Sequence, residues 1–232
     1  MAVVYDFMPV TLADYPGLVA STVFVAGCNF HCPYCHNSFL IDFLPSDRAK
    51  EDEFFSYLEK RKKMIDGVVV TGGEPTLNPG LKEFILKIKV MGYKVKLDTN
   101  GSKPEVLEDL IKDDLLDYIA MDIKAPENKY WIFTSNAREV MRDIKRSIEI
   151  TKKSGVIYEF RTTVHPGLLN IEDFKNMMDL LKGAERYVLQ AYRFSEQVLD
   201  AEFCGKEPVK KEYLMEIKEL LAEHIKIIEI RI

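Results

Sequence analysis

The sequence predicts an α/β fold built around one parallel sheet. Short apolar segments rich in β-branched residues alternate along the chain with longer segments whose apolar residues recur at helical spacing. The connections between them are short, which is typical of strand–helix units joined by right-handed crossovers. Six such units are two fewer than a closed (β/α)8 barrel contains, so we expect a partial barrel or a doubly wound sheet.

The composition is that of a globular protein with one sizeable core. The chain has 232 residues, of which 47% are apolar, and its 32 basic and 37 acidic residues give a net charge of -5. The basic residues are scattered rather than clustered with aromatic residues, which argues against a nucleic-acid partner. We expect no membrane partner, because the first twenty residues lack the features of a signal peptide and no apolar run approaches the roughly 18 residues of a membrane span. Three of the four cysteines share one loop, unlike a secreted disulfide framework, so we expect a cytoplasmic protein.

The chain begins with a segment that we expect to lie outside the repeating pattern. Residues 1–19 predict an N-terminal arm and turn, in which residues 1–11 form a short strand or an extended arm and Asp14-Tyr15-Pro16-Gly17 form the turn. Residues 20–26 are β-branched and apolar, and they predict the first buried strand. We therefore expect a single core domain over residues 20–232.

The later elements repeat the same two patterns. Further strands are predicted over residues 67–71, 93–97, 118–121, 156–164, 186–190 and 225–232. Helices are predicted over residues 51–63, 80–91, 104–112, 137–153, 171–181 and 209–224. Residues known to favour helix ends support these bounds. Ser46 or Asp47 and Asn170 are candidate N-caps, Pro104 suits the first position of a helix, and Gly155 suits the position just after a helix ends.

The loop after the first strand holds a CxxxCxxC array. Its thiols belong to Cys28, Cys32 and Cys35, and the few intervening residues favour a turn, so the three side chains can converge on one metal centre. A structural zinc ion would need a fourth ligand, which His31 or His36 could supply. A 4Fe-4S cluster with only three cysteines would leave one iron open to a substrate or cofactor. The spacing of the cysteines alone leaves both alternatives open.

Polar motifs follow three further strands at the point where each strand ends. These motifs are Gly72-Gly73-Glu74-Pro75, Asp98-Thr99-Asn100-Gly101 and Asp122-Ile123-Lys124. Because ligands of parallel sheets gather at the carboxyl ends of the strands, we expect the motifs to meet the cysteine loop at one edge of the sheet.

The cysteine array, with the aromatic residue Tyr34 before its last cysteine and the Gly-Gly-Glu-Pro motif after the next strand, resembles the radical S-adenosylmethionine superfamily. The segment of residues 11–17 and the motifs at Asp98 and Asp122 resemble the glycyl-radical-enzyme activases within it, and come closest to the activating proteins of anaerobic ribonucleoside-triphosphate reductases. The resemblance implies a partial (β/α)6 TIM-like barrel in a single domain. It also implies a 4Fe-4S cluster on the three cysteines, with S-adenosylmethionine chelating the open iron. The reduced cluster would pass one electron to the sulfonium, leaving methionine and a 5′-deoxyadenosyl radical.

The resemblance further implies which residues contact the cofactor. Gly72 and Gly73 would let backbone come close to the methionine portion, and Glu74 or neighbouring carbonyls would accept from its ammonium group. Lys124 would pair with the carboxylate, while Asp98 and Asp122 would bind the sugar or share a small cation. The full cofactor-binding set is Tyr34, Gly72, Gly73, Glu74, Pro75, Asp98, Asn100, Asp122, Lys124 and Arg161. We assign no catalytic residue beyond the cluster and cofactor ligands. His165 and Gln190 could line the mouth of the site or only be solvated, and Cys204 is interpreted as incidental.

The expected partners are proteins. The strand–helix units use nearly all residues and leave no lid, so we expect a large glycyl radical enzyme to shield the radical with its own glycine loop, and a flavodoxin- or ferredoxin-type electron donor. Activation of pyruvate formate-lyase or a related enzyme is the nearest alternative. Tyr15, where many lyase activases have glycine, favours the reductase. A small-molecule enzyme of the same superfamily and a non-catalytic zinc or ferredoxin-like module are further alternatives.

Overall fold

The computed structural model describes residues 4–42, 49–205 and 207–232, and within them the strands form one sheet in chain order. The first strand is antiparallel to the second, and each later strand is parallel to its neighbour. The strands are β1 (Val4–Thr11), β2 (Ala20–Val25), β3 (Gly67–Gly72), β4 (Lys94–Thr99), β5 (Tyr118–Asp122), β6 (Ile157–Val164), β7 (Arg186–Ala191) and β8 (Ile227–Arg231).

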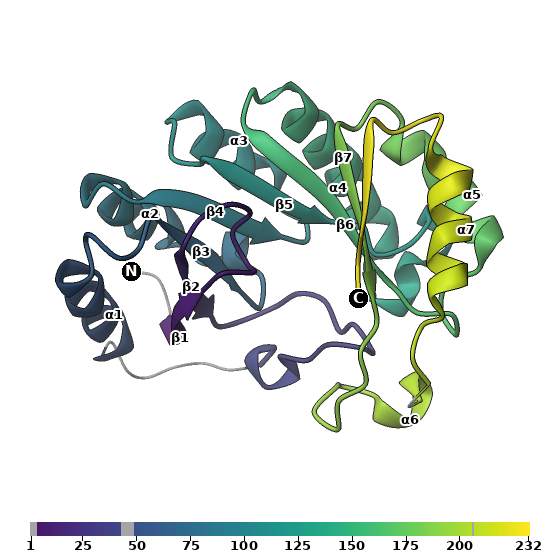
Figure 1. Cartoon of the computed structure of the whole chain (residues 1–232), viewed down its shortest axis with the longest axis horizontal. Helices are drawn as coiled ribbons and strands as arrows, with labels where there is room; N and C mark the ends of the chain where they lie inside the picture. Colours follow the sequence, from purple (N-terminus) through teal and green to yellow (C-terminus); the bar gives the residue numbers. More distant parts are fainter. Residues whose placement is uncertain (1–3, 43–48, 206) are drawn as a thin grey trace.

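The helices lie on the outer side of this curved sheet, and the loop after β2 runs across its open side (Figure 1). The α-helices are α1 (Ala49–Lys60), α2 (Leu81–Val90), α3 (Pro104–Lys112), α4 (Ala137–Lys153), α5 (Ile171–Leu181), α6 (Ala201–Cys204) and α7 (Lys211–Leu221). The described part of the chain also has 3-10 helices at Ser38–Leu40, Pro75–Leu77 and Glu127–Ile132. Within the described residues β1 and β8 end the sheet without pairing to each other, so the barrel is open. The expected partial barrel in a single α/β domain is confirmed.

The two faces of the sheet pack differently because side chains alternate along each strand. Val68 and Val70 of β3 belong to the main core between the sheet and the helices, together with apolar residues of α2 such as Phe84 and Ile88. Val69, between them, belongs to a small separate cluster on the inner face. The outer face is therefore a conventional apolar core, and the inner face is left for other side chains.

Tyr15 closes the amino-terminal end of the inner face. Its ring is 4% exposed and meets the ring of Tyr118 edge-on, with centroids 5.9 Å apart. A Cβ atom at Gly67 would come within 3.0 Å of the Tyr15 ring, so the glycine at the start of β3 makes room for it. The turn predicted at residues 14–17 thus supplies the floor of the open barrel.

Some elements differ from the predictions. Of the short strand or arm expected at the start of the chain, residues 4–11 form the strand β1, and its pairing with β2 makes it part of the sheet. The helix predicted to begin just after Pro208 starts at Lys211 and ends at Leu221. Helix α6 is not foreseen by the sequence reading, since four residues are too few for a periodic pattern. The caps expected at Ser46 or Asp47 lie outside the described residues.

Among the described residues, no helix combines the length and apolar character that crossing a bilayer requires.

Candidate active site

The cysteine loop is fixed at its base by backbone contacts. The Gly27 amide donates to the Leu40 carbonyl at 2.8 Å and the Cys28 amide to the Ile41 carbonyl at 3.2 Å, so the loop leaves β2 and returns to the same place. In the sheet register Val25, the last residue of β2, lies beside Gly72, the last residue of β3. The first two predicted motifs are therefore neighbours.

Gly72 and Gly73 make this close approach possible. Gly72 has a φ of +124°, and a Cβ on it would lie 2.4 Å from the backbone of Val25. A Cβ on Gly73 would lie 2.0 Å from the Gly27 carbonyl oxygen, and the Glu74 amide donates to the same oxygen at 2.7 Å. The glycines thus let the strand end pack against the base of the cysteine loop, a role that sequence reasoning did not assign to them.

The three cysteines of the loop are free thiols in a largely buried setting. Burial raises the pKa of Cys28 to about 12 and that of Cys32 to about 11, and it also raises the pKa of Cys35. The Lys124 ammonium opposes the effect of burial on all three thiol pKa values. A metal centre on these sulfurs would therefore have to displace their protons, as thiolate ligation always does.

The arrangement of these side chains bears on the kind of metal centre. Within residues 4–42, 49–205 and 207–232, no three His, Cys, Asp or Glu side chains are grouped so that they could hold one metal ion. His31 and His36 are both exposed. A 4Fe-4S cluster does not need its three thiolates to meet at a single ion, because each binds a different iron atom.

Glu74 joins the end of β3 to the end of β4. It is 1% exposed, and its carboxylate accepts hydrogen bonds from the Thr76 amide at 3.0 Å, the Thr99 hydroxyl at 2.7 Å and the Asn100 amide at 2.6 Å. Burial raises the pKa of Glu74, against these hydrogen bonds, which lower it. The carboxylate is committed to the protein, so nearby carbonyl oxygens are the better acceptors for an ammonium group.

Asn29, a residue that the sequence did not single out, ties the cysteine loop to the end of β4. Asn29, within the loop, accepts from the Asn100 amide group at 2.9 Å and donates to the Ser102 hydroxyl at 2.9 Å. Asn100 also positions the cysteine loop through this bond, and its expected contact with the cofactor stays a prediction. The only sequence signal for Asn29 was its place between two of the cysteines.

Charged side chains from β4, β5 and β6 form one network on the inner face. Arg161 bridges the two carboxylates, with its Nη1 3.0 Å from Asp98 and its Nε 2.8 Å from Asp122. Lys124 lies 2.8 Å from Asp122, and the buried Lys96 lies 2.5 Å from Asp98. The cation between the two carboxylates is therefore a guanidinium of the chain itself.

These ion pairs hold the carboxylates in their charged form. Burial alone would raise the pKa of Asp122, but Arg161 and Lys124 outweigh it and bring the pKa to about 2. The pKa of Asp98 is lowered in the same way, where Arg161 and Lys96 outweigh burial. Burial lowers the pKa of Lys124, but the negative charge of Asp122 outweighs it and the pKa is raised well above its usual value.

The predicted residues meet around a cavity of about 210 Å³. Its lining includes all three cysteines of the loop and eight of the ten residues expected to bind cofactor, together with Thr71 and Thr99 at the same strand ends. The eight are Gly72, Gly73, Glu74, Asp98, Asn100, Asp122, Lys124 and Arg161. Pro75 is buried and begins the 3-10 helix behind the cavity.

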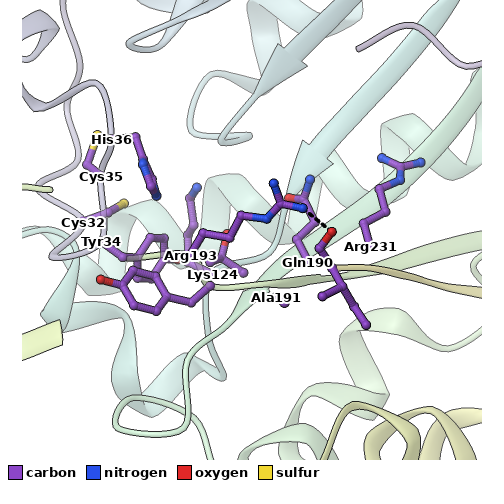
Figure 2. Close-up of a pocket in the computed structure, with 12 residues that line it drawn as sticks. Cys32, Tyr34, Cys35, His36, Lys124, Gln190, Ala191, Arg193 and Arg231 are labelled. Atoms are coloured by element: carbon purple, nitrogen blue, oxygen red, sulfur yellow. Dashed lines mark hydrogen bonds between the residues drawn. The ribbon is translucent and has the colours of Figure 1, made fainter. Parts of the chain in front are cut away.

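A second cavity of about 400 Å³ adjoins the first and shares Cys32, Cys35 and Lys124 with it. It contains Tyr34, and it extends past Gln190 towards Arg193 and Arg231 near the open edge of the barrel (Figure 2). The Tyr34 hydroxyl is buried and has no hydrogen-bond partner among the described residues. His165 does not line either cavity.

Fold and site together define a class of protein. Three cysteines in one loop stand at the carboxyl ends of parallel strands, and they face a cavity that carries both charges and enough polar groups to hold a charged organic cofactor. This is the arrangement of an iron–sulfur enzyme on a partial α/β barrel.

Comparison with known proteins identifies the family. Residues 22–181 match the Radical SAM superfamily, and the chain belongs to it. The putative glycyl-radical enzyme activating enzyme MJ1227 of Methanocaldococcus jannaschii is 32% identical over 99% of this chain and 96% of its own length. The pyruvate formate-lyase-activating enzyme of Clostridium pasteurianum is 26% identical over 96% of this chain and 98% of its own length. The structure of Streptococcus suis SuiB bound to S-adenosylmethionine has the same fold, with a TM-score of 0.63, 14% identity, and coverage of 88% of this chain and 48% of SuiB.

The chain is therefore a radical SAM enzyme homologous to glycyl-radical-enzyme activating enzymes. Enzymes of this superfamily use a 4Fe-4S cluster and S-adenosylmethionine, as the resemblance implied. Membership argues against a non-catalytic zinc or ferredoxin-like module.

Proposed function

We propose that the chain activates an anaerobic ribonucleoside-triphosphate reductase by removing a hydrogen atom from one of its glycines. The observation that carries the proposal is the shared wall of the two cavities. Cys32, Cys35 and Lys124 line both, so a cofactor in the first cavity would face the space that opens towards the edge of the barrel. A segment of a protein substrate entering the second cavity would come next to the cofactor.

In this proposal the cluster is held by Cys28, Cys32 and Cys35, and S-adenosylmethionine occupies the first cavity. When bound, these groups supply reductive cleavage of the cofactor and the one-electron chemistry that removes hydrogen. Lys124 pairs with the cofactor carboxylate, and carbonyl oxygens near Gly73 accept from its ammonium group. Asp98 and Asp122, held in their charged form by Arg161, accept from the sugar hydroxyls.

The remaining predicted residues act indirectly. Glu74 and Asn100 fix the strand ends and the cysteine loop through their hydrogen bonds, and Pro75 stiffens the exit of β3. Tyr34 lies at the wall of the second cavity and excludes water there. The electron donor is a flavodoxin- or ferredoxin-type protein, and the setting is the cytoplasm.

The choice of the reductase rests on the turn at residues 14–17. Tyr15 stands where many lyase activases have glycine. Its ring is buried against Tyr118 in the floor of the barrel, so this difference lies in the packed interior and not on the surface. The relative from Clostridium pasteurianum supports the second candidate function, activation of pyruvate formate-lyase or a related lyase.

One experiment separates the two. The reduced protein is mixed anaerobically with S-adenosylmethionine and either an anaerobic ribonucleotide reductase or a pyruvate formate-lyase, and the glycyl radical is measured by electron paramagnetic resonance. We expect a doublet signal with the reductase and none with the Cys32→Ala variant. A signal with the lyase alone would replace the first candidate by the second.

A further inference from the structure

The connection between β7 and α7 crosses the cysteine loop. We call residues 193–205 the strap. Within it, the Leu199 amide donates to the carbonyl of Cys35 at 3.2 Å and the Asp200 amide to the carbonyl of Pro33 at 2.9 Å. The Ser38 hydroxyl, just beyond the cysteine loop, donates to the Gln197 carbonyl at 3.2 Å. Figure 1 shows the strap descending from β7 past the loop towards α6.

The far end of the strap is held by His165, which follows β6. Its imidazole is 5% exposed, and Nε2 lies 2.8 Å from the carbonyl oxygen of Cys204. Nδ1 accepts from the Gly167 amide at 3.1 Å. Because a backbone amide can only donate and a carbonyl can only accept, the proton of the neutral ring is on Nε2, and His165 donates to the strap.

The surroundings of His165 fix the ring in this position. Its ring centroid lies 4.6 Å from that of Tyr192, the residue just before the strap. A Cβ on Gly167 would come within 3.0 Å of the imidazole, so the glycine allows the tight turn that brings its amide to Nδ1. Both ring nitrogens and one ring face are therefore engaged.

We infer that His165 is a positioning residue for the cluster site, acting through the strap on the backbone of Cys35. The inference rests on the proposed function, in which Cys35 is a cluster ligand. The strap carries exposed side chains at Leu199 and Phe203, and its buried anchors are Val198 and Cys204. The strap contacts the cysteine loop through single backbone hydrogen bonds that belong to no sheet or helix. Because these bonds are few, fixing the strap at Cys204 limits how far the carbonyl groups of Pro33 and Cys35 can move.

Two substitutions separate the two hydrogen bonds of the imidazole. His165→Gln can keep a donor near the position of Nε2 and so preserve the bond to Cys204. His165→Asn can keep an acceptor near Nδ1 for the Gly167 amide but is too short to reach the strap. Tyr213→Phe is the matched control, because it removes a 2.6 Å bond from a side chain to the Leu169 carbonyl in the same β6–α5 connection without touching the strap.

The test compares these variants in the cluster-loaded protein. We expect His165→Asn to raise amide hydrogen exchange at Leu199 and Asp200 about tenfold, the effect of one lost hydrogen bond. We also expect faster extraction of iron by a chelator and an altered electron paramagnetic resonance spectrum of the reduced cluster. His165→Gln and Tyr213→Phe should match the wild type in all three measurements. Ser38→Ala, which removes the hydroxyl that donates to the strap at Gln197, should raise the same exchange rates about threefold, and it tests the link between strap and cluster if His165→Asn does not fold.

Unchanged exchange at both amides, or equal effects of His165→Gln and His165→Asn, would overturn the inference. So would a loosened strap with unchanged chelation and spectrum, because His165 would then only stabilise the fold. Failure of the proposed function has a different signature. If the wild-type protein makes no glycyl radical on the reductase, the proposed partner is wrong. Amide exchange and the cluster spectra do not require the partner, so the comparison among the variants still tests the role of His165.

Discussion

Arg161 shows how single residues of this site serve both the fold and the cofactor cavity. Its guanidinium is 11% exposed and contacts carboxylates from two different strands, Asp98 of β4 and Asp122 of β5. A rigid, forked donor suits this task better than a lysine ammonium, which is a single point charge. Sequence reasoning placed Arg161 beside an anionic cofactor, but it could not foresee the pairing, because the contact depends on the strand register.

Arg161→Ala should therefore destabilise the protein by about 3 kcal/mol, because it leaves two half-buried carboxylates with only their lysine partners. It should also change the pH dependence. In the wild type the pKa of Asp122 is about 2 against an ordinary 3.8, so its contribution to stability is complete above pH 3.8 and is lost as the pH falls through about 2. Without Arg161 the pKa of Asp122 rises, and this contribution shrinks.

Denaturant unfolding between pH 7 and pH 2 measures both effects. Arg161→Lys, which keeps one charge but loses the second contact, should fall between the wild type and the alanine variant. Equal stability of all three at pH 7 would show that the network is not a source of stability.

Lys124 is the single residue whose removal should most directly weaken cofactor binding. It lines both cavities, and its ammonium group is the charge that lies near the thiols and Asp122. Losing a hydrogen bond to a charged group costs about 1.5–3 kcal/mol, so Lys124→Ala should weaken S-adenosylmethionine binding at least tenfold. Equilibrium binding to the cluster-loaded protein measures the loss. Iron and sulfide content should stay at the wild-type level, and Lys82→Ala on the surface should change neither quantity.

The elements follow local patterns wherever a pattern exists. The strand at residues 67–71 and the helix at 171–181 were predicted almost to the residue, because β-branched runs and the Asn170 cap are local signals. The strap and α6 were missed for the opposite reason. Their place is fixed by backbone bonds to the cysteine loop, with Leu199 bonded to Cys35 across more than 160 residues of chain. No spacing of side chains records such a contact.

The junction of β3 with the cysteine loop gives a prediction at the scale of elements. Gly73→Ala would place a Cβ 2.0 Å from the Gly27 carbonyl, a contact that only a backbone shift can relieve. We expect overpacking of this kind to cost about 1–3 kcal/mol and to reduce the iron bound per chain, measured after anaerobic reconstitution. Gly183→Ala is the control. A φ of +77° would strain an alanine at this position, but the added Cβ would meet nothing within 4 Å. Normal iron content in Gly73→Ala would contradict this account of the motif.

The open barrel sets what the whole molecule can do. Partial closure was predictable from the number of strand–helix units, and the meeting of the motifs at one edge followed from the parallel order of the strands. The second cavity was not predictable, because it depends on how the strap, the cysteine loop and β8 are placed in space. Its side chains include Arg193 and Arg231, which the sequence reading did not single out.

If the second cavity receives the glycine segment of the partner, filling it should separate cofactor chemistry from activation. Gln190 lines this cavity but not the first one. Gln190→Trp should therefore lower the yield of glycyl radical on the partner at least tenfold, because the larger side chain occupies part of a space of about 400 Å³. The affinity for S-adenosylmethionine, measured without partner, should stay within about threefold of the wild type, since 0.6 kcal/mol or less is expected from a residue outside the first cavity. Gln190→Ala, which enlarges the cavity, should keep most of the radical yield. An unchanged yield in Gln190→Trp would mean that the partner reaches the cofactor by another route.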